Sequence, residues 1–253
     1  MSAVEPAVRW LSQGESDVPA GLDWLAGFER ERLGRIRFRK RLDDYLLGRW
    51  TAKRALALHL GVPLVAPALA TLEIRHAPGG APIAARGGTR LPVEISISDR
   101  AGQATCAVAP AGLALGCDLE LVEPRSRRFV ADYLTETEQG VVARARDACE
   151  HDLFANLFWS AKESALKLLG TGLRRDTRSV EIRLASDAVP AGWRRLEALT
   201  EEGGTYAGWW RLFSPFVLTV VVAGAVDPPH AMIEPPGLLG ARPSHSWIQA
   251  PCV

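Results

Sequence analysis

The sequence lacks a large excess of charge of either sign. Its 30 lysine and arginine residues nearly cancel its 29 aspartate and glutamate residues, which leaves a formal net charge of +1. A dedicated nucleic-acid-binding protein usually carries a clear basic excess, so the charge balance argues against that class. Any basic function must therefore be local. The apolar fraction of 47% is ordinary for a globular protein, and wholesale disorder is not expected.

Cysteines and long apolar runs are also scarce. The longest apolar run, residues 216–226, suits a buried strand and is too short to span a bilayer. The N-terminus shows no apolar segment of a secretory signal. We therefore expect a cytoplasmic protein with no membrane partner. A zinc site or a disulfide framework is not expected, because the four cysteines lie far apart without a C-x-x-C pair: Cys106, Cys117, Cys149 and Cys252.

Helix-type and strand-type patterns follow one another twice along the chain. The first block combines a helical pattern with three strand patterns: residues 22–60, then 72–76, 93–98 and 105–109. The second block combines a strand, two helices and three strands: residues 113–121, the segment after Thr135, 153–169, 180–184, 209–213 and 216–222. This order predicts an α+β protein of two similar halves, residues 1–112 and 113–226, although no internal repeat is obvious by eye. Proline and glycine recur without periodicity in residues 227–253, and we expect this tail to be mobile.

One acidic residue in the second block has a structural explanation. Thr135 is a good helix N-cap, and Glu138 three residues later completes a capping-box pattern. In such a box each side chain accepts a hydrogen bond from the other residue's backbone. We therefore interpret Glu138 as structural rather than catalytic.

The segment Gly116-Cys-Asp-Leu-Glu120 carries the first pattern with chemical content. On a strand, Asp118 and Glu120 project from the same face, while Cys117, Leu119 and Leu121 face the core. Adjacent carboxylates repel each other unless a cation lies between them, and Mg²⁺ prefers such hard oxygen ligands. A solvated sheet edge with incidental acids would show the same pattern, because D-x-E is common by chance.

The segment Trp159-Ser-Ala-Lys-Glu-Ser-Ala-Leu-Lys167 carries the second. Leu157, Ala161, Ala165 and Leu168 form one apolar arc of a helix, and Glu163 and Lys167 share a different face. A glutamate followed by a lysine four positions later is a common surface pair. By itself this segment is therefore explained as structural.

Together, the two segments resemble the paired signature of phosphopantetheinyl transferases of the surfactin-synthetase-activating type. That signature is G-[IV]-D-[IV]-E followed by W-[ST]-x-K-E-[AS]-x-x-K, from which Cys117 and Leu119 are mild departures. The resemblance extends from about Arg30 to Ala225. It implies two α+β halves related by a pseudo-twofold axis, with coenzyme A in the cleft between them. The implied reaction is Mg²⁺-dependent transfer of the 4′-phosphopantetheine arm of coenzyme A to a serine of an apo acyl or peptidyl carrier protein, releasing adenosine 3′,5′-bisphosphate.

The resemblance also implies roles for individual residues. Asp118, Glu120 and Glu163 would hold Mg²⁺, Glu163 would accept the proton of the carrier serine, and Lys167 would stabilise the leaving bisphosphate. A two-half protein of this kind has less reason to dimerise, so we expect a monomer. Cofactor contacts would come from Ser98, Asp99 and Lys162, and from two or three members of the basic region between Arg35 and Arg54: Arg37, Arg41, Arg49 and Lys53.

Two positions depart from the family pattern. In Gly79-Gly-Ala-Pro82, Ala81 replaces a basic residue, and Asp99 stands where the family has a histidine. An ionised carboxylate can only accept hydrogen bonds, so Asp99 either weakens coenzyme A binding or is neutralised by a nearby cation, with Arg100 the leading candidate.

The alternative function is a catalytically silent relative that binds a carrier protein. A nucleic-acid binder using residues 30–54 is disfavoured by the charge balance.

Overall fold

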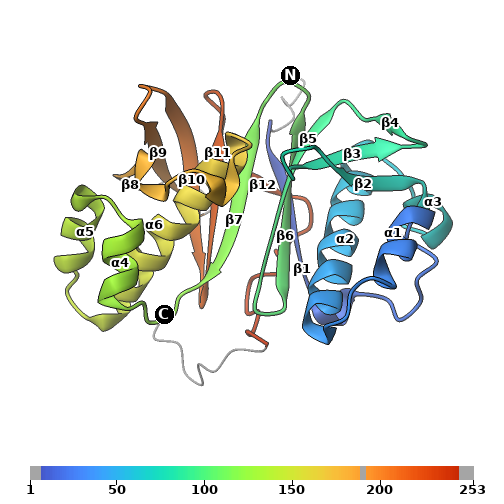
Figure 1. Ribbon diagram of the computed structural model, residues 1–253, viewed down its shortest axis with the longest axis horizontal. Coiled ribbons are helices and arrows are strands. Elements are labelled where there is room, and N and C mark those ends of the chain that lie inside the picture. The colour runs from blue at the N-terminus through green and yellow to red at the C-terminus, as the bar shows by residue number, and fades with distance from the viewer. Residues whose placement is uncertain (1–6, 189–191, 245–253) are drawn as a thin grey trace.

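The computed structural model describes residues 7–188 and 192–244, and Figure 1 shows their arrangement. Two large sheets lie in the centre, and helices cover the outer side of each. The first half contains these elements: β1 (Arg9–Gly14), η1 (Glu15–Asp17), α1 (Gly27–Leu33), α2 (Arg39–Leu60), α3 (Ala66–Ala70), β2 (Leu72–His76), β3 (Pro82–Arg86), β4 (Thr89–Arg90), β5 (Val93–Arg100) and β6 (Gln103–Pro110).

The rest of the described chain begins at the strand that carries Asp118. Its elements are β7 (Leu115–Leu121), α4 (Arg127–Tyr133), α5 (Glu136–Ala143), α6 (Ala148–Leu168), η2 (Gly172–Arg174), η3 (Thr177–Ser179), β8 (Val180–Ala188), β9 (Arg194–Thr200), β10 (Thr205–Phe213), β11 (Phe216–Val222) and β12 (His230–Ala231). None of the helices in the described ranges combines the length and the apolar character that a membrane crossing requires.

Antiparallel pairing builds most of the sheets. The strand orders are β12-β1-β6-β5 and β7-β11-β10-β9-β8, with a separate ribbon β2-β3-β4. Only the pair of β1 and β12 is parallel among the described pairs. The predicted α+β fold class is confirmed. The helix predicted over 22–60 is instead two helices, because Phe38 adopts an extended backbone (φ −99°, ψ 129°) as the N-cap of α2.

Three apolar clusters hold the layers together. One lies between α2 and the first sheet, and a second between α6 and the second sheet. The third joins the two large sheets, where Trp10 of β1 packs against Trp193 and Phe213 with ring centroids 6.1 and 5.4 Å apart. Cys117, Leu119 and Leu121 of β7 belong to this third cluster, as their alternation predicted.

The two halves share a strand order and a short sequence repeat. In the second sheet β7 is followed by β11 and β10, and in the first β1 is likewise followed by β6 and β5. The tetrapeptide Trp50-Thr-Ala-Lys53 on α2 matches Trp159-Ser-Ala-Lys162 on α6. This is the internal repeat that inspection of the sequence missed.

Each half also encloses a fully buried pair of a glutamate and a lysine, and the two pairs are built alike. Glu29 and Lys53 are fully buried with 2.5 Å between carboxylate and ammonium, and Glu138 and Lys162 are fully buried with 2.9 Å between theirs. Each glutamate accepts from a backbone N–H at the start of its own helix and from a strand, Ile74 or Ile182. Each lysine donates to two backbone carbonyls. The predicted capping box and the structural role of Glu138 are confirmed.

The tail departs from the prediction of mobility over its described part. Strand β12 pairs with β1, and the N–H of Met232 donates to the carbonyl of Trp10. Leu238 is fully buried in the cluster between the sheets, and its N–H donates to the hydroxyl of Ser12. The chain therefore returns from the second half to complete the first, up to Ser244; residues 245–253 lie outside the described part.

This packing predicts a stability difference between two adjacent leucines of the tail. Leu238→Ala should lower the free energy of unfolding by about 2–5 kcal/mol, because it opens a cavity in the core between the sheets. Leu239 is 62% exposed, and its substitution by alanine should change that free energy by no more than about 0.5 kcal/mol. Urea denaturation of both variants measures the difference, and equal stabilities would contradict the described packing of the tail.

Candidate functional site

A cavity of about 890 Å³ is lined by residues of both halves. Its walls come from the end of α1, the first turns of α2, the loop before β3, strand β5, the start of β7 and the end of α6. The lining residues are Arg32, Arg35, Ile36, Arg37, Phe38, Arg41, Asp44, Tyr45, Gly48, Arg49, His76, Gly79, Gly80, Ala81, Pro82, Glu94, Ile95, Ser96, Ile97, Asp99, Ala114, Leu115, Lys167, Leu168, Gly170 and Gly172.

Arginines dominate one side of this cavity. The predicted Arg37, Arg41 and Arg49 all line it, and Arg35 of the same basic region joins them. Arg32 lies on α1 before that region and was not predicted. Five guanidinium groups around one cavity favour a ligand with several negative charges, such as a polyphosphate.

Arg49 is fixed in this wall by its neighbours. Its Nη2 lies 2.7 Å from Nε2 of His76, and its guanidinium lies 4.8 Å from the ring centre of Tyr45. Nδ1 of His76 lies 3.0 Å from the carbonyl oxygen of Gly80. Burial lowers the pKa of His76, and the charge of Arg49 lowers it further. A neutral His76 that accepts from Arg49 and donates to Gly80 satisfies both contacts, so it ties the arginine to the glycine loop. Sequence reasoning missed this histidine.

Lys53 and Lys162 do not line the cavity, and their predicted phosphate contacts are corrected. Both ammonium groups are enclosed in the interior ion pairs with Glu29 and Glu138. Burial lowers the pKa of each lysine, and the paired glutamate acts against that shift. An ammonium group held by a buried carboxylate and two carbonyls has no path to a ligand in the cavity.

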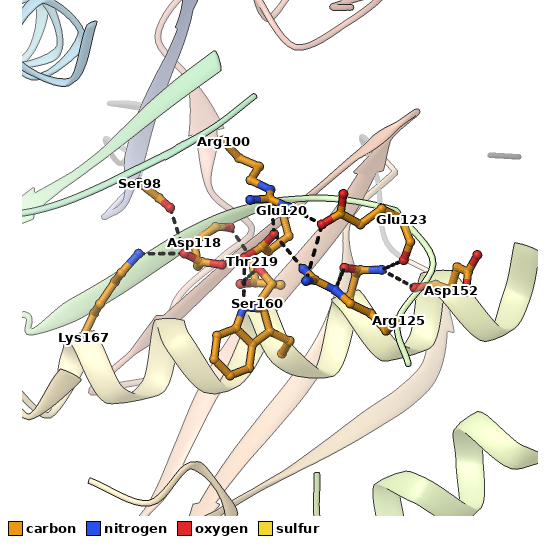
Figure 2. Close-up of polar contacts among 12 residues, drawn as sticks. Ser98, Arg100, Asp118, Glu120, Glu123, Arg125, Asp152, Ser160, Lys167 and Thr219 are labelled. Atoms are coloured by element: carbon orange, nitrogen blue, oxygen red, sulfur yellow. Dashed lines mark hydrogen bonds and ion pairs between the residues drawn. The ribbon is translucent and has the colours of Figure 1, made fainter. Parts of the chain in front are cut away.

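Asp118 is the centre of the polar contacts shown in Figure 2. Its Oδ1 accepts from Ser98 Oγ at 2.8 Å and from Lys167 Nζ at 2.7 Å. Its Oδ2 is buried and has no hydrogen-bond partner among the described residues. Ser98 therefore supports Asp118 from β5 and does not line the cavity as predicted. Burial acts to lower the pKa of Lys167, but Asp118, Cys117 and Glu163 together outweigh it and raise that pKa, so the lysine stays charged.

Glu120 is surrounded by donors. Trp159 Nε1 donates to its Oε1 at 2.9 Å, and Arg125 Nη2 donates to its Oε2 at 3.2 Å. Arg100 Nε also lies 3.2 Å from Oε2. Burial and the nearby charge of Asp118 raise the pKa of Glu120 to about 7.

Glu163 lies one helical turn before Lys167, with 4.0 Å between its Oε2 and the lysine Nζ. Burial and the charge of Asp118 raise the pKa of Glu163. Asp118 thus raises the pKa of both glutamates, which places the three carboxylates within electrostatic reach of one another. Asp118 and Glu120 lie on β7 and Glu163 lies on α6, and their joint role as metal ligands stays a prediction.

The three carboxylates are suitable ligands for a divalent cation by their chemistry, but they are not gathered around one point. Carboxylate oxygens suit Mg²⁺, and the buried Oδ2 of Asp118 has no hydrogen-bond partner among the described residues. Within residues 7–188 and 192–244, however, no three side chains of the metal-binding types are gathered closely enough to hold an ion. Asp118 and Glu163 are the freer ligands, since Glu120 is engaged by arginines.

Helix α6 is positioned against these strands by small residues. Ser160 Oγ donates to the carbonyl of Asp118, and Ser160 and Ser164 both contact the hydroxyl of Thr219 on β11. A Cβ on Gly116 would collide with the carbonyl oxygen of Ser164. The glycine that opens the first motif therefore permits the close approach that places Lys167 beside Asp118.

Asp99 lines the cavity, but Arg100 does not neutralise it. The Arg100 side chain contacts Glu120 and Glu123 instead, which overturns the predicted pairing. Burial within the cavity and the charge of Asp44 raise the pKa of Asp99 to about 6. The Ala81 loop also lines the cavity, and the carbonyl of its Gly79 accepts from Arg174 at 3.0 Å.

Comparison with known proteins gives a match for one part of the chain. Residues 114–206 are similar to the family model of the 4′-phosphopantetheinyl transferase superfamily. Asp118, Glu120, Glu163 and Lys167 all lie within the matched range. A crystal structure of holo-[acyl-carrier-protein] synthase from Thermotoga maritima is similar at 23% identity, over 43% of this chain and 61% of that chain, with a TM-score of 0.34. This likeness carries no argument about the site. A search of curated proteins gives no match.

Proposed function

We propose that this protein transfers the 4′-phosphopantetheine arm of coenzyme A to a serine of an apo acyl or peptidyl carrier protein. The main support is the contact of Asp118 with Lys167 beside an arginine-lined cavity, within the range of the superfamily match. In this reaction the serine oxygen bonds to the β-phosphorus of coenzyme A. The bond from that phosphorus to the bridging oxygen breaks, and adenosine 3′,5′-bisphosphate leaves.

The cavity suits coenzyme A in size and charge. Its volume of about 890 Å³ is in the range of sites for ligands of this size. Arg32, Arg35, Arg37, Arg41 and Arg49 would bind its phosphates, with Arg49 held in place by His76. Lys53, Lys162 and Ser98 are not part of this proposed set.

The acidic residues would hold the metal and accept the proton. Asp118 and Glu163, joined by Glu120, would bind Mg²⁺, which neutralises charge on the transferred phosphoryl group when bound. Glu163 would accept the proton of the serine hydroxyl, and its raised pKa makes it a stronger base near neutral pH. Lys167 remains charged and would stabilise the leaving bisphosphate.

We extend the proposal to the architecture: two halves related by a pseudo-twofold axis, with coenzyme A between them, acting as a monomer. The shared strand order, the repeated W-[ST]-A-K tetrapeptide and the matching buried ion pairs support the duplication. A cavity lined from both halves agrees with a ligand bound between them.

Intact mass spectrometry of a carrier protein tests this function. After incubation of the protein with an apo carrier, coenzyme A and Mg²⁺, the carrier should gain the mass of one arm, and a chelator should prevent the gain. No gain with several apo carriers that nonetheless bind the protein would favour the alternative, a catalytically silent carrier-binding protein.

Asp99 should make ligand binding depend on pH. Its carboxyl ionises as the pH rises through about 6, which adds negative charge to the cavity and weakens binding of adenosine 3′,5′-bisphosphate. The phosphate groups of the ligand titrate in the same region, so the wild-type protein is compared with Asp99→Asn. We expect similar affinities at pH 5 and about tenfold tighter binding by the variant at pH 7.5. Calorimetric titration measures both, and a constant ratio across this range would contradict the role of Asp99.

A further inference from the structure

The side chain of Arg100, the last residue of β5, contacts two carboxylates of the second half, those of Glu120 and Glu123. Its Nε lies 3.2 Å from Glu120 Oε2, and its Nη2 donates to Glu123 Oε1 (Figure 2). We propose that Arg100 competes with a divalent metal ion for Glu120 and thereby sets the metal affinity of the site. This inference rests on the metal set of the proposed function, and it assigns a role to a residue outside that set.

A second arginine contacts the same two glutamates but is held much more firmly. Arg125 Nε donates to Asn156 Oδ1 at 2.7 Å, and its guanidinium lies 4.6 Å from the ring centre of Phe129. Asn156 is itself fully buried, and its amide donates to the backbone carbonyls of Glu123 and Asp152. Arg125 is therefore a fixed partner of Glu120.

Arg100 has no comparable anchor. Its side chain is 36% exposed, against 17% for Arg125. Its Nε faces Glu120 without the alignment of a hydrogen bond, and that contact is an ion pair only. Of the two arginines, Arg100 is the one that can leave Glu120 and remain solvated, while Arg125 continues to compensate Glu123.

The backbone below Arg100 is fixed, so its competition is confined to the side chain. Arg100 precedes the turn Ala101-Gly102, where both residues have positive φ angles, 49° and 77°. The N–H of Ser244 in the tail donates to the carbonyl of Ala101 at 2.8 Å, and a Cβ on Gly102 would overlap the Ser244 side chain. The returning tail thus holds this turn, and with it the start of the Arg100 side chain, beside Glu120.

The charges around the site show what a metal ion would encounter. Among the ion pairs of the described residues, Arg100 and Arg125 balance Glu120 and Glu123, whereas Asp118 and Glu163 pair with Lys167. A cation that enters the site meets one uncompensated negative charge. It can bind Glu120 only after an arginine has moved away from that carboxylate. Arg100 therefore opposes the ion in two ways, by occupying a ligand and by repelling like charge.

Mn²⁺ binding, measured by electron paramagnetic resonance without coenzyme A or a carrier, tests the proposal. Arg100→Met keeps an unbranched, largely apolar side chain and removes the charge, and it should tighten Mn²⁺ binding by about tenfold. The matched control is Arg183→Met, which removes an arginine that is 61% exposed and paired with Glu181 on β8. The control should bind Mn²⁺ as the wild type does. Unchanged or weaker binding by Arg100→Met would overturn the proposal.

A double-mutant cycle separates competition for Glu120 from simple repulsion. In a Glu120→Gln background the ligand at stake is gone, so Arg100→Met should tighten binding by no more than about twofold. A full gain in that background means that Arg100 acts through its charge alone, and competition is refuted. Circular dichroism melting of each variant confirms that the compared proteins are folded.

The result is independent of the transferase assay. A protein that transfers no arm can still show the Arg100 effect on Mn²⁺, and an active enzyme can lack it. Binding by Arg100→Met where the wild type shows none supports the proposal strongly. If neither binds Mn²⁺ at millimolar concentration, Arg100 is not what limits the site, and the inference fails whatever the activity.

Discussion

Asp118→Asn is expected to lower the rate of phosphopantetheine transfer by about 10³-fold or more while leaving the fold intact. Asp118 contacts Lys167 directly, and its second oxygen is unpartnered within the described residues and faces no competing donor there. The amide keeps the shape and can still accept from Ser98, but it removes the charge that would bind the metal. It also removes the main influence that raises the pKa of Lys167.

Steady-state kinetics with an apo carrier and coenzyme A measures the loss, and Asp132→Asn is the matched control. Asp132 is 54% exposed on α4 and pairs only with Arg128 at the surface among the described contacts, so its amide variant should keep wild-type turnover. Thermal melting of both variants without metal checks that each is folded. Near-normal turnover by Asp118→Asn would remove the metal set from the proposal.

Local sequence patterns predicted the parts of the fold that depend on neighbouring residues. Alternation along 115–121 gave the core face of β7, and the apolar arc of 157–168 gave the buried face of α6. The capping box at Thr135 appears as predicted. In each case the deciding interactions lie within a few positions along the chain, which a periodic pattern can report.

The errors concern residues whose partners lie far away in sequence. Helical spacing could not show whether Lys53 and Lys162 face a ligand or a buried glutamate, because Glu29 and Glu138 lie on other helices. Its place next to Asp99 in the sequence suggested Arg100 as the neutralising partner, but the partners of Arg100 are Glu120 on β7 and Glu123 after it. The tail was expected to be mobile from its recurring proline and glycine. That pattern could not show its pairing with β1, a strand at the opposite end of the chain. The tetrapeptide repeat at 50–53 and 159–162 was the available signal for the two lysines.

Lys162→Met is expected to lower the free energy of unfolding by about 3–5 kcal/mol, the usual cost of leaving one partner of a buried ion pair alone. Methionine fills much of the same space, so the loss comes from the charge of Glu138, which stays fully buried. Denaturant unfolding monitored by circular dichroism measures it. The control is Lys40→Met, whose side chain is 66% exposed in a surface pair with Asp44 and should cost no more than about 1 kcal/mol.

Three related measurements test the two buried ion pairs further. Lys53→Met should show a smaller loss, because Glu29 is equally enclosed but keeps Arg49 Nε at 3.9 Å from its Oε1. Adding Glu138→Gln to Lys162→Met should restore part of the stability, since the stranded charge is removed.

Burial already raises the pKa of Glu138, and the loss of Lys162 raises it further, so the folded variant takes up a proton more readily than the unfolded chain. The deficit of Lys162→Met should therefore shrink as the pH falls through that raised pKa. A deficit that is small or independent of pH would mean that water reaches Glu138, and that the two halves do not enclose equivalent ion pairs.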